Sequence, residues 1–219
     1  GAGEATVLAY PAGVAAEAVI AVKLDKGADA LTSRRAGAAI ARAADGADVT
    51  VVASAHKQAA EIAAGFALAA YAFSDHKTDS GGPAPMPRQA RVMVTKPEDV
   101  AAQAADMAAV TEGVFYTRDL VNAPANVLTT ESFAASLAAM GELGLKVEIM
   151  EEAELAERGF RLLLGVGQGS VSPSKVVVMT WSGGADDAPP LALVGKGVVF
   201  DTGGISIKPA QGMEEMTMD

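Results

Sequence analysis

Residues 47–73, ADVTVVASAHKQAAEIAAGFALAAYAF, predict a strand that is followed directly by a helix. The segment 47–54 is rich in β-branched residues, which favour strands. The segment 57–73 is alanine-rich and nearly apolar, which is typical of a helix that is largely buried. Strands that alternate with helices of this length indicate an α/β domain with a mostly parallel sheet.

The same alternation extends to both sides of this stretch. A helix is predicted over 32–45, with Thr32 or Ser33 available to cap it and Gly46 to end it. Residues 74–88 are rich in Gly, Pro and Ser, which predicts a loop. Further strands are predicted over 5–10, 17–24 and 90–95. We therefore expect an N-terminal α/β domain over residues 1–96.

A long helix is predicted over residues 97–122. Pro97 suits the first turn of a helix, and Pro124 forces the residue before it out of the helical conformation. Five residues at three- and four-residue spacing form one stripe along this helix: Val100, Ala104, Met107, Thr111 and Val114. We interpret the segment as an interdomain helix.

Residues 123–219 return to the alternating pattern. Helices are predicted over 130–140 and 151–159, and strands over 145–150, 175–181 and 190–195. We expect this region to be the first part of a second α/β domain, with a mixed and mostly parallel sheet.

The composition excludes several classes of protein. The net charge of −10 would repel phosphate backbones, so we expect no nucleic-acid partner. The longest alanine-rich apolar stretch, 63–73, is too short to span a bilayer, so no membrane association is expected. The chain has no cysteine, which excludes disulfides and thiolate metal ligands. It begins with Gly1 rather than Met, and we expect that it is cut at both ends.

Two features are interpreted without a functional role. Residues 165–170, GVGQGS, resemble a phosphate-binding loop, but Ser170 replaces the third glycine. We expect an ordinary glycine-rich turn there. His56 and His76 lie in unrelated segments with no carboxylate at metal-ligand spacing, so no role is assigned to them.

The strongest chemical signal lies in residues 193–219, LVGKGVVFDTGGISIKPAQGMEEMTMD. Lys196, Asp201 and Lys208 interrupt segments that are otherwise apolar, where an unpaired charge is costly. Lys196 and Asp201 have opposite strand parity, so they can meet only through a bulge or at a strand end. A hairpin whose charges simply face water is the alternative interpretation.

These residue types suit a metal-dependent hydrolase. Carboxylate oxygens are ligands for divalent metals such as Zn²⁺ or Mn²⁺. A lysine can join them only as the neutral amine, because the metal must displace the proton. A second lysine that keeps its charge could polarise a carbonyl oxygen beside two metal ions.

Residues 195–219 resemble the signature of the leucyl (cytosol) aminopeptidases, a family of dinuclear metallo-exopeptidases. TRDLVNAPANVLTTESFA (117–134) resembles the end of that family's interdomain helix and its continuation, and 159–181 resembles the stretch before its metal strand. The similarity covers most of residues 98–219 in the same order. Residues 1–96 resemble the family's variable N-terminal α/β domain only in general character.

The resemblance implies a role for five residues. Lys196 would be the amine ligand, Asp201 the carboxylate shared by two divalent metal ions, and Asp219 a further metal ligand. Lys208 would be the catalytic lysine that polarises the scissile carbonyl. Met216 would line the pocket for the first side chain of the substrate, and an apolar pocket suits leucine-like residues.

The resemblance also implies partners and a compartment. The substrates would be peptides with a free N-terminus, since the α-amine binds a metal. The protein would be cytoplasmic and homo-oligomeric, as a hexamer.

Three expectations stay open. The family's remaining Asp and Glu ligands and its anion-binding Arg lie in a motif that the chain does not reach, so we expect the isolated chain to be inactive. A non-catalytic scaffold or oligomerisation fragment is the first alternative. An aspartic peptidase is the second, because residues 201–203 read D-T-G. Such enzymes pair two aspartates in a mostly β protein, which the predicted helices disfavour.

Overall fold

The computed structural model describes residues 3–76, 78, 89–185 and 188–217. The chain divides into two compact units, Gly1–Asp119 and Leu120–Asp219, which are described separately. Both units mix helices with strands, so the predicted α/β class is confirmed. Within the described ranges, no helix combines the length and apolar character that a membrane span requires.

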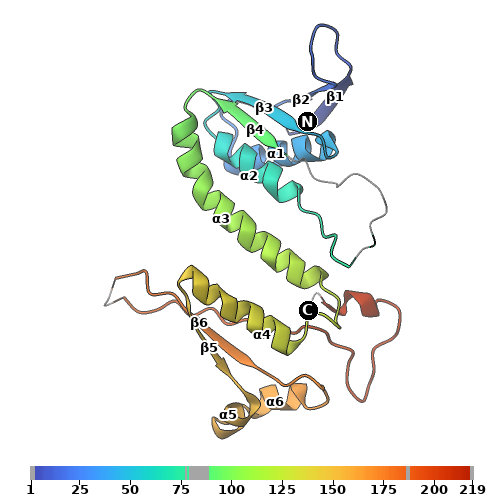
Figure 1. The fold of residues 1–219 in the computed structure, drawn as a ribbon, viewed down its shortest axis with the longest axis vertical. Coiled ribbons are helices and arrows are strands. Elements are labelled where there is room, and N and C mark those ends of the chain that lie inside the picture. The colour runs from blue at the N-terminus through green and yellow to red at the C-terminus, as the bar shows by residue number, and fades with distance from the viewer. Residues whose placement is uncertain (1–2, 77, 79–88, 186–187, 218–219) are drawn as a thin grey trace. The chain divides into compact units, whose positions relative to one another are not determined.

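The described part of the first unit contains two pairs of strands, two helices and most of a third (Figure 1). β1 (Ala5–Ala9) pairs antiparallel with β2 (Ala18–Val22), and β3 (Val49–Ser54) pairs parallel with β4 (Ala90–Val94). The helices are α1 (Ala30–Ala44), α2 (Ala59–Ala69) and α3 (Pro97–Asn122). The expected mostly parallel sheet is therefore confirmed only in part, because only β3 and β4 pair in parallel among the described strands.

The core of this unit lies where α1 and α2 pack against β3. Its buried side chains are those of Ile40, Ala41, Val51, Ile62 and Phe66. The two helices approach closely because both carry glycine at the contact. A Cβ atom added to Gly37 would lie 2.0 Å from the Ile62 carbonyl oxygen, and one added to Gly65 would lie 2.0 Å from that of Arg34.

An ion pair joins the same two helices. The Arg34 guanidinium bonds to the Glu61 carboxylate, whose side chain is only 9% exposed. Because a buried carboxylate needs a charged or hydrogen-bonding partner, this pair accounts for the polar residue in an apolar interface.

The N-cap of α1 differs from the expectation. Asp29, rather than Thr32 or Ser33, caps the helix, and its carboxylate accepts a hydrogen bond from the Thr32 backbone N–H at 2.7 Å. The helix begins two residues earlier than predicted, at Ala30. An aspartate just before the first turn is a favoured cap because it satisfies an otherwise unpaired backbone N–H.

The predicted long helix is confirmed as α3, and its predicted stripe is the less exposed face. Thr111 is buried, and the other four residues of the stripe are half-buried. Near the C-terminal end of α3, Arg118 donates to the Leu68 carbonyl at 2.8 Å and lies 5.3 Å from the Tyr71 ring centre. The Tyr71 hydroxyl donates to Asp119 at 2.8 Å. These contacts attach α3 to the segment around the end of α2.

In the described residues of the second unit, β5 (Lys146–Met150) pairs antiparallel with β6 (Val176–Thr180). Its helices are α4 (Thr130–Ala139), α5 (Glu152–Glu157) and α6 (Arg161–Gly167), with 3-10 turns at η1 (Met140–Leu143) and η2 (Met213–Thr217). Thr129 and Ser132 form a reciprocal capping box at the start of α4. Leu155 on α5 is fully buried.

Three expectations for this unit are wrong or confirmed only in part. The mostly parallel sheet is not formed among the described residues, where β5 and β6 pair antiparallel. The predicted strand over 190–195 is absent, and its Leu191, Leu193 and Val194 side chains are between 87% and 97% exposed. A strand is stabilised by pairing, and no described strand pairs with this segment. Part of the glycine-rich stretch 165–170 belongs to helix α6.

Candidate active site

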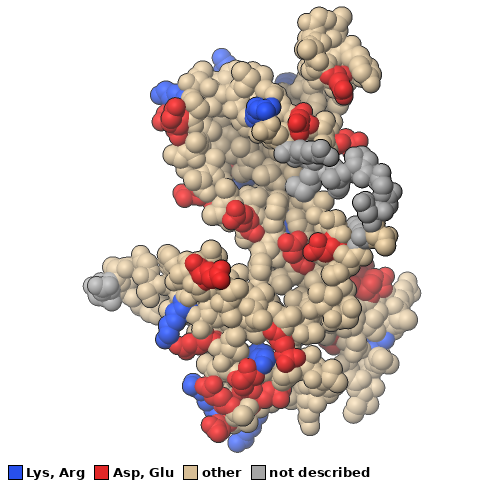
Figure 2. All heavy atoms as spheres, in the orientation of Figure 1, with Lys and Arg blue, Asp and Glu red and all other residues tan. Residues whose placement is uncertain are grey.

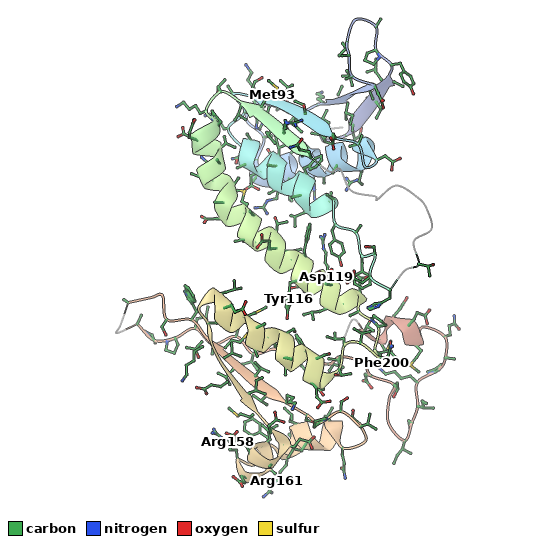
Figure 3. All side chains as sticks on the ribbon, viewed as in Figure 1. Met93, Tyr116, Asp119, Arg158, Arg161 and Phe200 are labelled. Atoms are coloured by element: carbon green, nitrogen blue, oxygen red, sulfur yellow. The ribbon has the colours of Figure 1, made fainter. Side chains whose placement is uncertain are left out.

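A tight loop spans residues 201–208, in the chain that follows Phe200 (Figure 3). Gly203 and Ile207 form an antiparallel bridge, and the Lys208 backbone N–H donates to the Thr202 carbonyl at 2.9 Å. Gly203 has φ +95°, and a Cβ atom there would lie 2.5 Å from the Ser206 carbonyl oxygen. Only glycine fits this position without strain. Asp201 and Lys208 therefore stand at the two ends of the loop and lie close together in space.

Asp201 is held by both ends of this turn. Its Oδ1 atom accepts a hydrogen bond from the Gly203 N–H at 2.8 Å, and its Oδ2 atom lies 3.2 Å from Lys208 Nζ. The bond from the Gly203 N–H, followed by that from Lys208, lowers the pKa of Asp201 below its ordinary value. The carboxylate is therefore ionised at neutral pH, as a metal ligand must be.

Lys208 also contacts Met216. The Lys208 Nζ atom donates to the Met216 thioether Sδ at 2.9 Å. Gly212, with φ +79°, lets the chain turn back, and η2 then presents Met216 to the ammonium group. η2 is the short red helix in Figure 1. The loop and η2 thus bring together three of the five predicted site residues.

Lys196 lies less closely. It is exposed and belongs to the extended segment before Asp201, and no described hydrogen bond or ion pair joins the two residues. Its positive charge is nevertheless close enough to make a small contribution to the lowered pKa of Asp201. The expectation of a bulge or a strand end between Lys196 and Asp201 is wrong, because the segment before Lys196 forms no strand. Asp219 lies outside the described residues.

The side-chain groups near the loop are of the types that bind divalent metal ions. Asp201 offers an ionised carboxylate that is 41% exposed, and Lys196 offers an exposed amine. Oxygen and nitrogen donors of these types bind Zn²⁺ and Mn²⁺. In the part of the chain that the structure describes, no three His, Asp or Glu side chains are grouped for a metal ion. Asp201 is thus the carboxylate of the described loop that can ligate a metal, with Lys196 as the nearby amine.

The two histidines lie in a different unit from the candidate site. His56 is half-buried, and its ring nitrogens contact the Asp25 carbonyl at 3.1 Å and the Gln58 N–H at 3.2 Å. His76 is exposed in the loop after α2. Both belong to the first unit, whereas the candidate site belongs to the second.

Two contacts of the site were missed from the sequence. The pairing of Lys208 with Asp201, and the contact of Lys208 with Met216, both depend on how tightly the chain turns. The available signals were the paired glycines at 203–204 and the Pro209 and Gly212 that frame the next turn. Those signals predict turns, but they do not predict which side chains meet across them.

The charge of the surface agrees with the acidic composition. Figure 2 shows acidic side chains on both units, and basic side chains only as separate groups on the face drawn, as far as the described residues go. This distribution is unlike the continuous basic surface that binds nucleic acid.

Comparison with known proteins identifies relatives of the chain. The family model "Cytosol aminopeptidase family, catalytic domain" matches residues 115–219. The chain is 60% identical over 217 residues to a probable cytosol aminopeptidase of Cereibacter sphaeroides, and 54% identical over 220 residues to one of Dinoroseobacter shibae. In both comparisons 99% of this chain aligns, but it spans only 44% of the relative's length.

The fold has relatives among solved structures. The bottromycin maturation enzyme BotP in complex with Mn superimposes with a TM-score of 0.78 and 29% sequence identity. That match covers all of this chain and 47% of BotP. Sequence and fold thus agree, and this chain belongs to the cytosol aminopeptidase family, with residues 115–219 matching its catalytic domain.

Proposed function

We propose that this chain is part of a metal-dependent aminopeptidase that releases apolar, leucine-like residues from peptides with a free N-terminus. The observation that carries the proposal is the contact of Asp201 with Lys208, at 3.2 Å, inside the segment that matches the family's catalytic domain. The match to a complex that contains Mn supports a divalent metal, either Mn²⁺ or Zn²⁺.

The predicted site residues divide into two chemical roles. Asp201 would be the carboxylate shared by two metal ions, with Lys196 as the amine ligand and Asp219 as a further ligand. Metal ions bound there would supply Lewis acidity and lower the pKa of water for attack on the peptide carbonyl. Lys208 would keep its proton and donate a hydrogen bond to the carbonyl oxygen, where negative charge develops.

Met216 would take part in substrate selection. Its thioether side chain is flexible and apolar, so it can pack against a leucine-like side chain. In the structure the Met216 sulfur contacts the Lys208 ammonium group, which would place the selecting residue beside the polarising one.

The compartment and the oligomeric state are part of the same proposal. We propose a cytoplasmic protein, because the curated relatives are called cytosol aminopeptidases. We also propose a homo-oligomer, with a hexamer as the expected form. Sedimentation of the whole protein would test the assembly, and a monomer at micromolar concentration would contradict it.

The domain organisation is part of the proposal. Residues 1–96 would form the N-terminal domain, 97–122 the interdomain helix and 123–219 the first part of the catalytic domain. A non-catalytic scaffold is the competing proposal, and an aspartic peptidase is disfavoured by the family match.

Hydrolysis of a leucine anilide by the whole protein tests the function. We expect activity with Mn²⁺ that a chelator removes and added metal restores. Lys208→Ala should lower kcat by about 100-fold, because one donor to the developing oxyanion is lost. Asp201→Asn should weaken metal binding as well as lower kcat.

Lys96→Ala provides the matched control. Lys96 is 79% exposed in the first unit and pairs only loosely with Asp99, so activity should be unchanged. Activity that resists the chelator, or a Lys208→Ala protein as active as the wild type, would overturn the proposal. A folded, oligomeric whole protein with no activity under any metal would favour the scaffold.

A further inference from the structure

The contact between Lys208 and Met216 joins a cation to an oxidisable sulfur atom. The Lys208 Nζ atom donates to Met216 Sδ at 2.9 Å, and both side chains are only partly exposed. A thioether sulfur is a weak hydrogen-bond acceptor. The same ammonium group lies 3.2 Å from the Asp201 carboxylate, which is a stronger acceptor than the sulfur atom.

We infer that Met216 is an oxidative modification site whose state controls Lys208. A peroxide is the chemical class of oxidant. The sulfur lone pair attacks one peroxide oxygen, and the O–O bond breaks as the S–O bond forms. The leaving hydroxide then takes the proton from the new S–OH group to become water. The sulfur loses two electrons and the peroxide gains them, which gives methionine sulfoxide.

The product is a much stronger partner for the lysine. The sulfoxide oxygen is polar and accepts a charge-assisted hydrogen bond from the ammonium group. Because Met216 lies on η2, which the turn at Gly212 presents to Lys208, the new oxygen forms next to the existing donor. Oxidation therefore strengthens the hydrogen bond between Lys208 and Met216 on η2.

The stronger hydrogen bond has a consequence for activity, and this consequence rests on the proposed function. A lysine that donates to the sulfoxide is withdrawn from the scissile carbonyl, and the apolar pocket residue becomes polar. Oxidation should therefore lower aminopeptidase activity, and methionine sulfoxide reductases should restore it.

Met93 and Met213 serve as internal references. Met93 is 57% exposed on β4 in the first unit, where Figure 3 labels it. Met213 lies on η2 and is partly exposed like Met216, but no described contact joins it to Lys208. Peptide mapping after hydrogen peroxide treatment therefore measures how far each of the three methionines is oxidised under the same conditions.

The first experiment uses the 219-residue chain and needs no activity. Hydrogen peroxide should convert Met216 to the sulfoxide, and NMR should show slower hydrogen exchange at the Lys208 ammonium group. The slowing should be about threefold to tenfold, since a charge-assisted hydrogen bond replaces a weak one. Treatment with methionine sulfoxide reductases should reverse the slowing. The oxidised and reduced forms of the same protein can then be compared without a variant. Met213→Leu should show the same slowing, and Met216→Leu none.

Three results would overturn the inference. Met216 could stay unoxidised while Met93 is fully converted. The sulfoxide could form with no change in the exchange at Lys208, or Met216→Leu could show the same slowing as the wild type.

The second experiment measures leucine anilide turnover by the whole protein with Mn²⁺, before and after peroxide. The ratio of treated to untreated activity should fall about tenfold in the wild type and in Met213→Leu, but not in Met216→Leu. An equal loss in Met216→Leu would contradict the control of Lys208 by Met216. A whole protein inactive before treatment would instead contradict the proposed function, and the exchange measurement would still decide the modification.

Discussion

Gly203 fixes the conformation of the loop that carries Asp201. Its φ is +95°, and a Cβ atom added there would approach the Ser206 carbonyl oxygen to 2.5 Å, which excludes other residues. The same turn contains the hydrogen bond from the Lys208 N–H to the Thr202 carbonyl. One glycine thus controls whether the carboxylate and the lysine meet.

Gly203→Ala should open this loop. We expect hydrogen exchange at the Lys208 backbone N–H to rise about tenfold, because the left-handed conformation and the close contact are both strained for alanine. Gly204→Ala is the matched control, since a Cβ atom there meets nothing within 4 Å. Equal exchange rates in the two variants would contradict the role given to Gly203.

Individual site residues could be named from the sequence, but their contacts could not. The types and spacing of Lys196, Asp201 and Lys208 indicated a site because charge interrupts an apolar pattern. The ion pair of Asp201 with Lys208 depends on the left-handed conformation of Gly203. The amino-acid sequence alone does not specify that backbone angle. The position of Met216 depends in the same way on the turn at Gly212.

At the scale of elements, the packing of α1 on α2 depends on two glycines. Cβ atoms added to Gly37 and Gly65 would lie 2.0 Å from carbonyl oxygens of the facing helix. Backbone atoms cannot move aside as a flexible side chain can. The helices must therefore separate to accept any larger residue.

Gly65→Ala should lower the free energy of unfolding by about 2 kcal/mol or more, as overpacking of a tight interface does. Urea denaturation measures this change. Gly113→Ala, on the open face of α3, should instead raise the free energy of unfolding by up to about 1 kcal/mol, because alanine is the better helix former. Equal midpoints for both variants would show that α1 and α2 do not pack this closely.

The Asp29 cap predicts a dependence of α1 on pH. Hydrogen bonds from the Thr32 side chain and backbone lower the pKa of Asp29. Its contribution to stability is therefore present above the unfolded-state pKa of Asp, about 3.9, and is lost as the pH falls through the lower folded value.

The urea midpoint of Asp29→Ala should accordingly lie below that of the wild type at pH 7, and the difference should shrink at acidic pH. Asp29→Asn is the control, because asparagine also caps helices but does not titrate. A difference between Asp29→Ala and the wild type that stays constant down to acidic pH would contradict the charged cap.

Helices were more predictable than sheets for a physical reason. The long α3 and its less exposed stripe follow from local spacing, which lies within one segment. Strand pairing depends on distant partners, so the parallel arrangement is confirmed only in part and the strand over 190–195 was predicted wrongly. Helix α6 was missed because Gly165 and Gly167 weaken its helical signal.

At the scale of the whole molecule, family membership rests on sequence and fold together. The aligned relatives share 60% and 54% identity with almost the whole chain, yet the chain spans 44% of their length. The terminal motif could be assigned to the family from the sequence alone because its charged and glycine residues are closely spaced. The division into domains at 96 and 122 stays a prediction.

We propose above all that Asp201 and Lys196 bind a metal ion beside Lys208. Crystals of the whole protein grown with Mn²⁺ would test it most directly, through the anomalous signal of manganese. We predict a peak about 2.0–2.4 Å from an Asp201 carboxylate oxygen and near the Lys196 amine, with Lys208 close by but not bound to the metal. Manganese bound only elsewhere, with Asp201 still held by Gly203 and Lys208 alone, would contradict the account.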